Sequence, residues 1–69
     1  MNKEFQVHML NDEGKAKARV IAEAFDECLT KLLVPCPPGR ELALVRTKLE
    51  EACFFAKKSM ANAPGNTVE

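Results

Sequence analysis

Three prolines in the five residues 35–39, PCPPG, divide this chain of 69 residues and limit how it can fold. Proline cannot continue a helix, because its ring removes the backbone N–H and clashes with the preceding turn. Segments with helical patterning lie on both sides of this connector. A short stiff connector between two helices favours an antiparallel arrangement, and the prolines lower the entropy lost when the turn closes. The sequence therefore predicts one all-α domain over residues 1–69, an antiparallel two-helix hairpin with a short N-terminal segment.

The first helix is predicted over residues 11–34. Asn11 is a favoured N-cap residue, and Asp12 and Glu13 follow in the first turn, where the helix dipole favours acids. Apolar residues then recur at three- and four-residue steps, which is typical of one buried helix face. This stripe consists of Ala18, Ile21, Phe25, Cys28, Leu29 and Leu32.

The second helix is predicted over residues 40–62, after the proline turn at 35–39. Residues 1–10 form a lead-in that could be extended or helical, and residues 63–69 form a polar tail that we expect to be mobile. Leu44, Phe54 and Phe55 fall partly outside the main stripe, so this helix has more apolar surface than one partner covers. The stripe itself has heptad-like spacing and consists of Leu42, Val45, Leu49, Ala52, Cys53, Ala56 and Met60.

A chain of this length needs support beyond its own core. At this size folding buries only about 60% of the unfolded surface, so small domains add disulfides, a metal or oligomerisation. Three cysteines without a C-x-x-C pair, and His8 as the single histidine, argue against zinc. An odd cysteine count without a secretory segment indicates a reducing cytosol. We expect Cys28 and Cys53 to be core residues, and we expect a homo-oligomer.

Composition and motifs narrow the function classes. Ten basic and ten acidic residues balance, which argues against general DNA binding. No apolar run approaches the roughly 20 residues that span a bilayer, so we expect no membrane partner. The sequence contains no phosphate-binding glycine loop, no nucleophile elbow and no convincing Cys–His pairing. We therefore expect a binding or structural protein, not an enzyme, with no catalytic residues, no metal and no cofactor.

A group of basic residues in the first half of the first helix has two interpretations. Lys15 and Arg19 are four residues apart and share a face, whereas Lys17 points elsewhere. These cations could form a solvated surface balanced by neighbouring acids. They could equally form a phosphate-binding edge, since lysine supplies a mobile charge and arginine a planar fork.

The second helix carries another polar group with the same ambiguity, formed by Arg40, Arg46, Thr47 and Lys48. Arg40 lies near the helix start, where free N–H groups also attract anions. These residues could instead pair with neighbouring glutamates. Phe54 and Phe55 are adjacent, so we expect one in the hairpin core and one facing outward, either as a subunit contact or as a platform for a base. Phe5 and His8 in the lead-in carry the same ambiguity.

The second helix also resembles a known family, the hairpin domain shared by phage anti-CBASS and anti-Thoeris sponge proteins. The resemblance covers about 22 residues and is supported by a preceding helix of suitable length. The matching features are Arg40, Leu42, Ala43, Leu44, Thr47, Leu49, Glu50, Glu51, Ala52, Phe54 or Phe55, and Ala61.

The resemblance implies a helical hairpin that assembles into a hexamer and sequesters cyclic nucleotide signals without cleaving them, in the host cell cytoplasm. Its ligands would be cyclic dinucleotides, cyclic trinucleotides or cyclic ADP-ribose derivatives, held in pockets between protomers. Phe5 or His8 would stack on a base, and Lys15, Lys17 or Arg19 would neutralise phosphates. Two alternatives stay open: a structural adaptor that binds a protein partner, and, disfavoured by the balanced charge, a small DNA-binding regulator.

Overall fold

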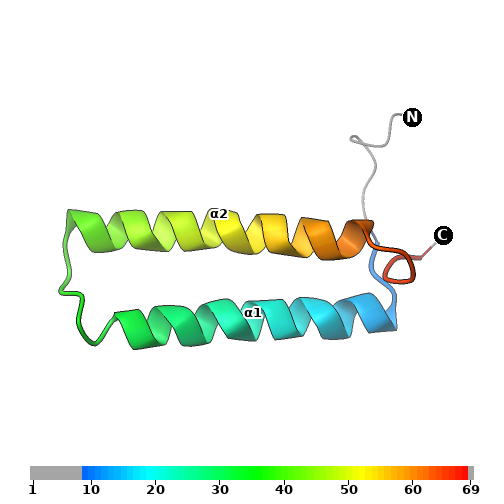
Figure 1. Ribbon diagram of the computed structural model, residues 1–69, viewed down its shortest axis with the longest axis horizontal. Helices are drawn as coiled ribbons and strands as arrows, with labels where there is room; N and C mark the ends of the chain where they lie inside the picture. Colours follow the sequence, from blue (N-terminus) through cyan, green and yellow to red (C-terminus); the bar gives the residue numbers. More distant parts are fainter. Residues whose placement is uncertain (1–8, 69) are drawn as a thin grey trace.

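The computed structural model describes residues 9–68, and there the chain forms two antiparallel helices joined by one turn (Figure 1). Helix α1 spans Asp12–Leu32 and helix α2 spans Arg40–Asn62. These described residues contain no strand, although an isolated antiparallel bridge joins Leu10 to Thr67. The predicted all-α hairpin is confirmed for this part of the chain.

Local chemistry accounts for both ends of α1. Asn11 is the N-cap, and its side chain accepts a 2.8 Å hydrogen bond from the backbone N–H of Gly14. The helix ends at Leu32, two residues before the predicted end, with Leu33 as its C-cap. The N–H of Cys36 donates to the carbonyl of Leu32, which closes a turn directly after the helix. The helix therefore ends before the first proline, Pro35.

Helix α2 begins directly after the proline turn. Its N-cap is Gly39, which has no side chain, so this helix start lacks the side-chain capping hydrogen bond that Asn11 supplies to α1. The acidic Glu41 in the first turn suits the positive end of the helix dipole. The helix ends at Asn62, and the N–H of the C-cap Ala63 donates to the carbonyl of Met60.

The two helices form one layer, which leaves the hydrophobic core thin. The shortest extent of the molecule is 12 Å, about the diameter of a single helix with its side chains. Among the described apolar residues, only Leu42 and Ala61 are buried. The rest of the seam between the helices is half-buried: Ala18, Ile21, Ala22, Phe25, Leu29 and Leu32 of α1, and Val45, Leu49, Cys53, Ala56 and Met60 of α2.

Two residues that we assigned to the apolar stripes lie outside the seam. Cys28 and Ala52 are exposed, so the expectation that Cys28 is a core residue is wrong. Each precedes a half-buried seam residue by one position, which rotates it about 100° around the helix. Each helix has only one partner, and that partner covers too narrow an arc to reach Cys28 on α1 or Ala52 on α2. Cys53 is half-buried, in keeping with its place in the seam.

The tail is also not what its composition predicts. Residues 63–68 fold back against the start of α1, and we call this segment the C-terminal clasp. Gly65 has a φ of 87°, a left-handed conformation that favours glycine, and reverses the chain. The N–H of Val68 then donates to the carbonyl of Met9 at 2.8 Å. Asn66 is only 2% exposed, so the clasp packs against the hairpin, an arrangement that the polar composition of the tail did not predict.

Candidate ligand-binding surface

The basic residues of α1 lie at the end of the hairpin that the clasp closes. Lys15, Lys17 and Arg19 are all exposed. The Nζ of Lys17 donates a 2.7 Å hydrogen bond to Oδ1 of Asn66 in the clasp. Because an amide is neutral, this bond orients the ammonium group without cancelling its charge. Lys15 and Arg19 lie on a different face of the helix from Lys17.

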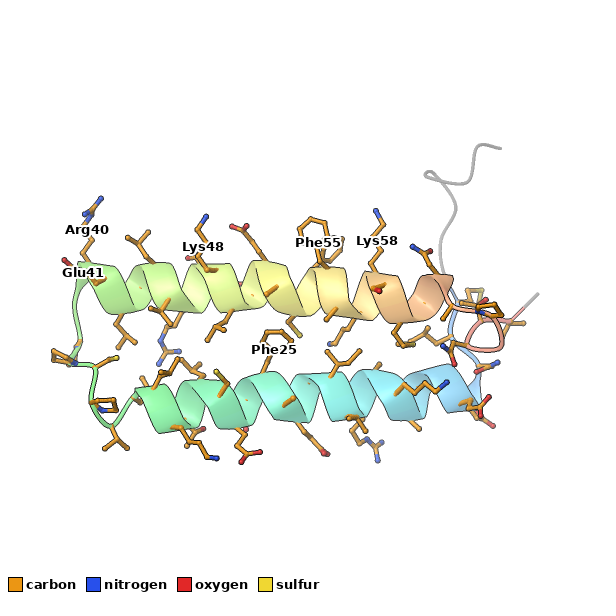
Figure 2. All side chains as sticks on the ribbon, viewed as in Figure 1. Phe25, Arg40, Glu41, Lys48, Phe55 and Lys58 are labelled. Carbon is orange, nitrogen blue, oxygen red and sulfur yellow. The ribbon has the colours of Figure 1, made fainter. Side chains whose placement is uncertain are left out.

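The polar residues of α2 mostly face away from α1. Arg40 and Lys48 project from the outer side of the helix (Figure 2). The Nζ of Lys48 lies 3.9 Å from Oε1 of Glu51, a long ion pair between exposed side chains that contributes little. The hydroxyl of Thr47 donates to the carbonyl of Ala43 at 3.1 Å, so its oxygen remains available only as an acceptor.

Arg46 differs from this group because it lines a shallow depression between the two helices. The carboxylates of Asp26 and Glu50 line the same depression, together with Phe25, whose ring lies between the helices (Figure 2). A phosphate placed there would meet one positive and two negative side chains. In a single chain this depression is therefore a poor anion site.

The two basic groups do not meet within one chain. Because the helices are antiparallel, residues 15–19 lie beside the last turns of α2, whereas residues 40–48 lie beside the last turns of α1 (Figure 1). The two basic groups therefore lie toward opposite ends of the hairpin. The two predicted stacking residues, Phe5 and His8, lie outside the described residues.

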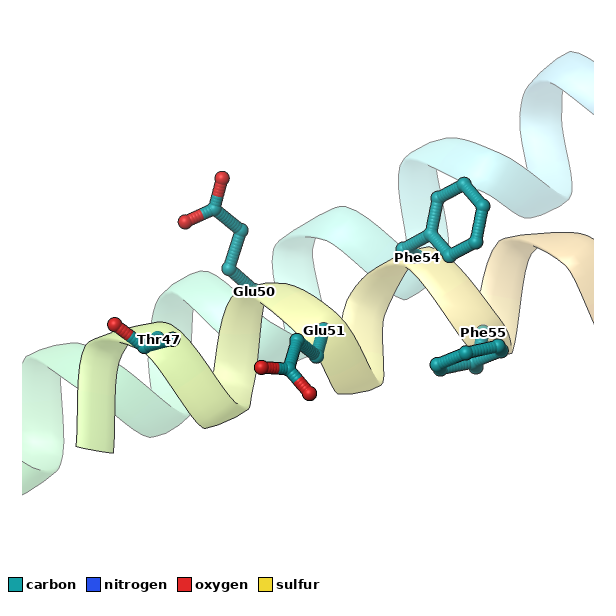
Figure 3. Close-up of a pocket in the computed structure, with 5 residues that line it drawn as sticks. All are labelled: Thr47, Glu50, Glu51, Phe54 and Phe55. Atoms are coloured by element: carbon teal, nitrogen blue, oxygen red, sulfur yellow. The ribbon is translucent and has the colours of Figure 1, made fainter. Parts of the chain in front are cut away.

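Phe54 and Phe55 both face solvent, so the prediction that one of them enters the core is wrong. They are 60% and 61% exposed, and their rings meet edge to face with centroids 5.3 Å apart. Neither position falls within the arc of α2 that α1 covers. Thr47, Glu50 and Glu51 join the two rings around an open surface hollow (Figure 3).

The chemistry of this hollow suits a protein contact better than a nucleotide. Aromatic rings offer large apolar area at low entropic cost, which is why they are common at subunit interfaces. Two carboxylates on its rim would repel phosphates. Of the two predicted roles for these phenylalanines, the geometry favours the subunit contact.

A comparison with known families decides where this hairpin belongs. The family model described as the Acb2/Tad1 hairpin domain matches residues 1–61. The chain belongs to the Acb2/Tad1 hairpin-domain family. This is the anti-CBASS and anti-Thoeris sponge family, so the resemblance noted on the second helix is confirmed. No curated protein and no solved structure matches the chain significantly.

The Acb2/Tad1 match covers the helical hairpin but not the C-terminal clasp. It covers all of α1 and all but the last residue of α2, and it stops before the clasp. The Acb2/Tad1 hairpin is a sponge-type domain and not a catalytic fold. All the basic candidate residues therefore lie within the family domain, whereas the partner of Lys17 lies outside it.

Sequence reasoning missed the clasp residues entirely. Asn66 and Gly65 follow a proline in a polar segment, which resembles many mobile tails. One signal was present: Gly14 interrupts the first turn of an otherwise strong helix, and an isolated helical glycine often marks close packing. A Cβ added at Gly14 would overlap the carbonyl oxygen of Asn66.

Other kinds of site find no support in residues 9–68. No group of three histidine, cysteine or acidic side chains there could hold a metal ion. Cys28, Cys36 and Cys53 are free thiols. Within the same residues, neither helix is long and apolar enough to cross a bilayer.

Proposed function

We propose that this protein is an anti-defence sponge that binds cyclic oligonucleotide second messengers, cyclic di- or trinucleotides, and holds them without cleaving them. The family match over residues 1–61 carries this proposal. Sequestration lowers the free concentration of a signal by binding alone, so it needs affinity and abundance but no reacting group. Cyclic ADP-ribose derivatives combine phosphates with a purine and belong to the same ligand chemistry. The host cell cytoplasm is the proposed site of action.

The exposed cations supply the chemistry for the phosphates. Lys15, Lys17 and Arg19 contribute three positive charges near the start of α1, and charge-assisted hydrogen bonds to phosphate are among the stronger polar contacts. Phe5 or His8 would stack on a base. A second interface would add contacts from the polar group of α2: Arg40, Arg46, Thr47 and Lys48.

Binding across chains requires assembly, and we propose a homo-oligomer, a hexamer, with its pockets between protomers. Two observations support assembly. The hairpin is a single layer with a thin core, and large apolar side chains stay exposed on the outer side of α2. Neighbouring protomers would cover Phe54 and Phe55, which gives the surplus apolar surface a partner.

Single replacements test this assembly surface. We expect Phe54→Ala or Phe55→Ala to weaken self-association by about tenfold or more, since aromatic residues dominate interface energetics. Analytical ultracentrifugation over a concentration series measures the change, with the exposed α2 residue Ser59→Ala as the matched control. If both phenylalanine variants associate as tightly as the control, the proposed surface is wrong.

A depletion experiment tests the sponge directly. The purified protein is incubated with cyclic di- and trinucleotides, separated from the free fraction and heated, and the released nucleotide is identified by mass spectrometry. We expect depletion of at least one nucleotide and its release with unchanged mass. A released product of different mass would indicate an enzyme.

The hollow at Phe54 and Phe55 favours one alternative, a structural adaptor that binds a protein partner through its apolar face. An adaptor would leave every nucleotide in the free fraction. The same depletion experiment therefore separates the two functions.

A further inference from the structure

The most buried polar side chain of the clasp has a hydrogen-bond partner at both its oxygen and its nitrogen. Asn66 is 2% exposed, and its Nδ2 donates to the carbonyl of Met60 at 2.9 Å. Its Oδ1 accepts from Nζ of Lys17 at 2.7 Å. Its backbone carbonyl accepts from the N–H of Asn11 at 3.1 Å. One residue thus joins the end of α2, the cap of α1 and a lysine 49 positions away.

The backbone around Asn66 holds this side chain in place. Asn11 donates from Nδ2 to the carbonyl of Gly65 at 2.8 Å while its Oδ1 caps α1. Gly14 lets the carbonyl of Asn66 approach the helix more closely than any other residue would permit. The position of the amide is therefore set by contacts on several sides.

Lys17 differs from the lysines of the described ion pairs. Lys31 lies 2.9 Å from a carboxylate oxygen of Glu27, and Lys48 lies 3.9 Å from one of Glu51, so each has an opposing charge. Lys17 is held by a neutral amide and keeps its full positive charge. An ammonium group has three N–H donors, and the bond to Asn66 uses one of them.

This arrangement prepares Lys17 for an anion. Lysine loses much side-chain entropy when it is ordered, and a ligand that orders it on binding loses affinity accordingly. A lysine ordered before binding avoids that loss. We infer that Asn66 is a positioning residue that holds the Lys17 ammonium ready for a ligand phosphate, which makes the clasp part of the binding site although it lies beyond the family domain. This inference rests on the proposed function.

A double-mutant cycle tests the inference. Kd is measured by titration calorimetry with cyclic di-AMP, 3′,3′-cyclic GMP–AMP and cyclic tri-AMP, and the tightest ligand of the unmodified protein is carried forward. Lys17→Met removes the charge but keeps the alkyl stem. We expect Asn66→Ala to weaken binding about fivefold in the unmodified background and less than twofold in the Lys17→Met background. Asn62→Ala, an exposed asparagine of α2, is the matched control.

The two Lys17 backgrounds separate positioning from general stability. Asn66→Asp keeps the acceptor for Lys17 but loses the Nδ2 donor to the carbonyl of Met60 and adds a negative charge, so in the unmodified background we expect it to weaken phosphate binding more than Asn66→Ala does. A residue that only stabilises the fold would instead weaken binding equally in both Lys17 backgrounds. That result overturns the inference, as does Asn66→Ala binding as tightly as the control.

A ligand-free measurement keeps the two proposals distinguishable. Nuclear magnetic resonance relaxation of the lysine side chains should show Lys17 more ordered than Lys15 in the unmodified protein and equally mobile after Asn66→Ala. Equal mobility before the change overturns the inference alone. If the unmodified protein binds no nucleotide, the proposed function fails, and with it the ligand role of Lys17.

Discussion

The two ends of this hairpin are closed by different means. At the end where the chain turns from α1 to α2, prolines restrict the backbone, Val34 is 88% exposed, and Gly39 caps α2 without a side-chain hydrogen bond. At the opposite end, the clasp joins residues from both ends of the described chain through the buried and hydrogen-bonded side chain of Asn66. The first end relies on covalent stiffness and the second on specific contacts.

This difference has a consequence for function. Stiffness built into the connector acts mainly by limiting the unfolded chain, so it places no demand on particular side chains elsewhere. The clasp depends on the side chain of Asn66, which also contacts Lys17, one of the basic residues of α1. Changes at the clasped end should therefore alter stability and ligand binding together, whereas changes at the turn that leave Arg40 in place should alter mainly stability.

The largest expected effect separates the two ends by one type of substitution. Gly14→Ala forces a Cβ into the carbonyl of Asn66, whereas Gly39→Ala meets no atom within 4 Å. We expect Gly14→Ala to lower the free energy of unfolding by about 3 kcal/mol, as overpacking does, and Gly39→Ala to change it by less than about 0.5 kcal/mol. Urea unfolding followed by circular dichroism measures both. Equal effects would show that the clasp does not pack as described.

A smaller effect is expected from the clasp amide. Asn66→Ala leaves the Met60 carbonyl and the Lys17 ammonium without this partner, and we expect a loss of about 2 kcal/mol in unfolding free energy. The exposed Asn62→Ala should lose less than about 0.5 kcal/mol. Thermal unfolding at matched protein concentration gives the comparison. A loss at Asn66 no greater than that at Asn62 would contradict the role of the clasp.

The smallest effect is expected at the turn. Pro37→Ala gives the unfolded chain more freedom and should cost about 0.5–1 kcal/mol. Because the turn lies at the far end from Lys15, Lys17 and Arg19, and the substitution leaves Arg40 in the first turn of α2, nucleotide affinity per assembled oligomer should stay within about twofold. Calorimetric titration of this variant checks that expectation. A large loss of affinity would mean that the turn also shapes the ligand site, either through the neighbouring Arg40 or by coupling between the two ends.

Much of the helical framework could be predicted from local chemistry. Asn11 marks the start of α1 through its side-chain capping bond, and the prolines after Leu32 exclude any continuation past the turn. Periodicity was less reliable at the margins of each stripe. It placed Cys28 and Ala52 in the seam because a helical pattern does not reveal how wide an arc one partner covers.

The clasp and the site could not be predicted in the same way. Burial of Asn66 depends on Lys17 and Asn11, which are far away in the sequence, and no local pattern carries that pairing. The orientation of Phe54 and Phe55 depends on the absence of a third helix within residues 9–68. For the basic residues, exposure alone does not distinguish a solvated lysine from one that faces a ligand in an assembled pocket.

The central claim is that the protein holds intact cyclic nucleotides between copies of itself. Native mass spectrometry of the protein with the tightest ligand tests both parts in one spectrum. We predict a complex of six copies that releases nucleotide of unchanged mass on collisional activation. A monomer without bound nucleotide, under conditions that preserve known weak complexes, would contradict the account.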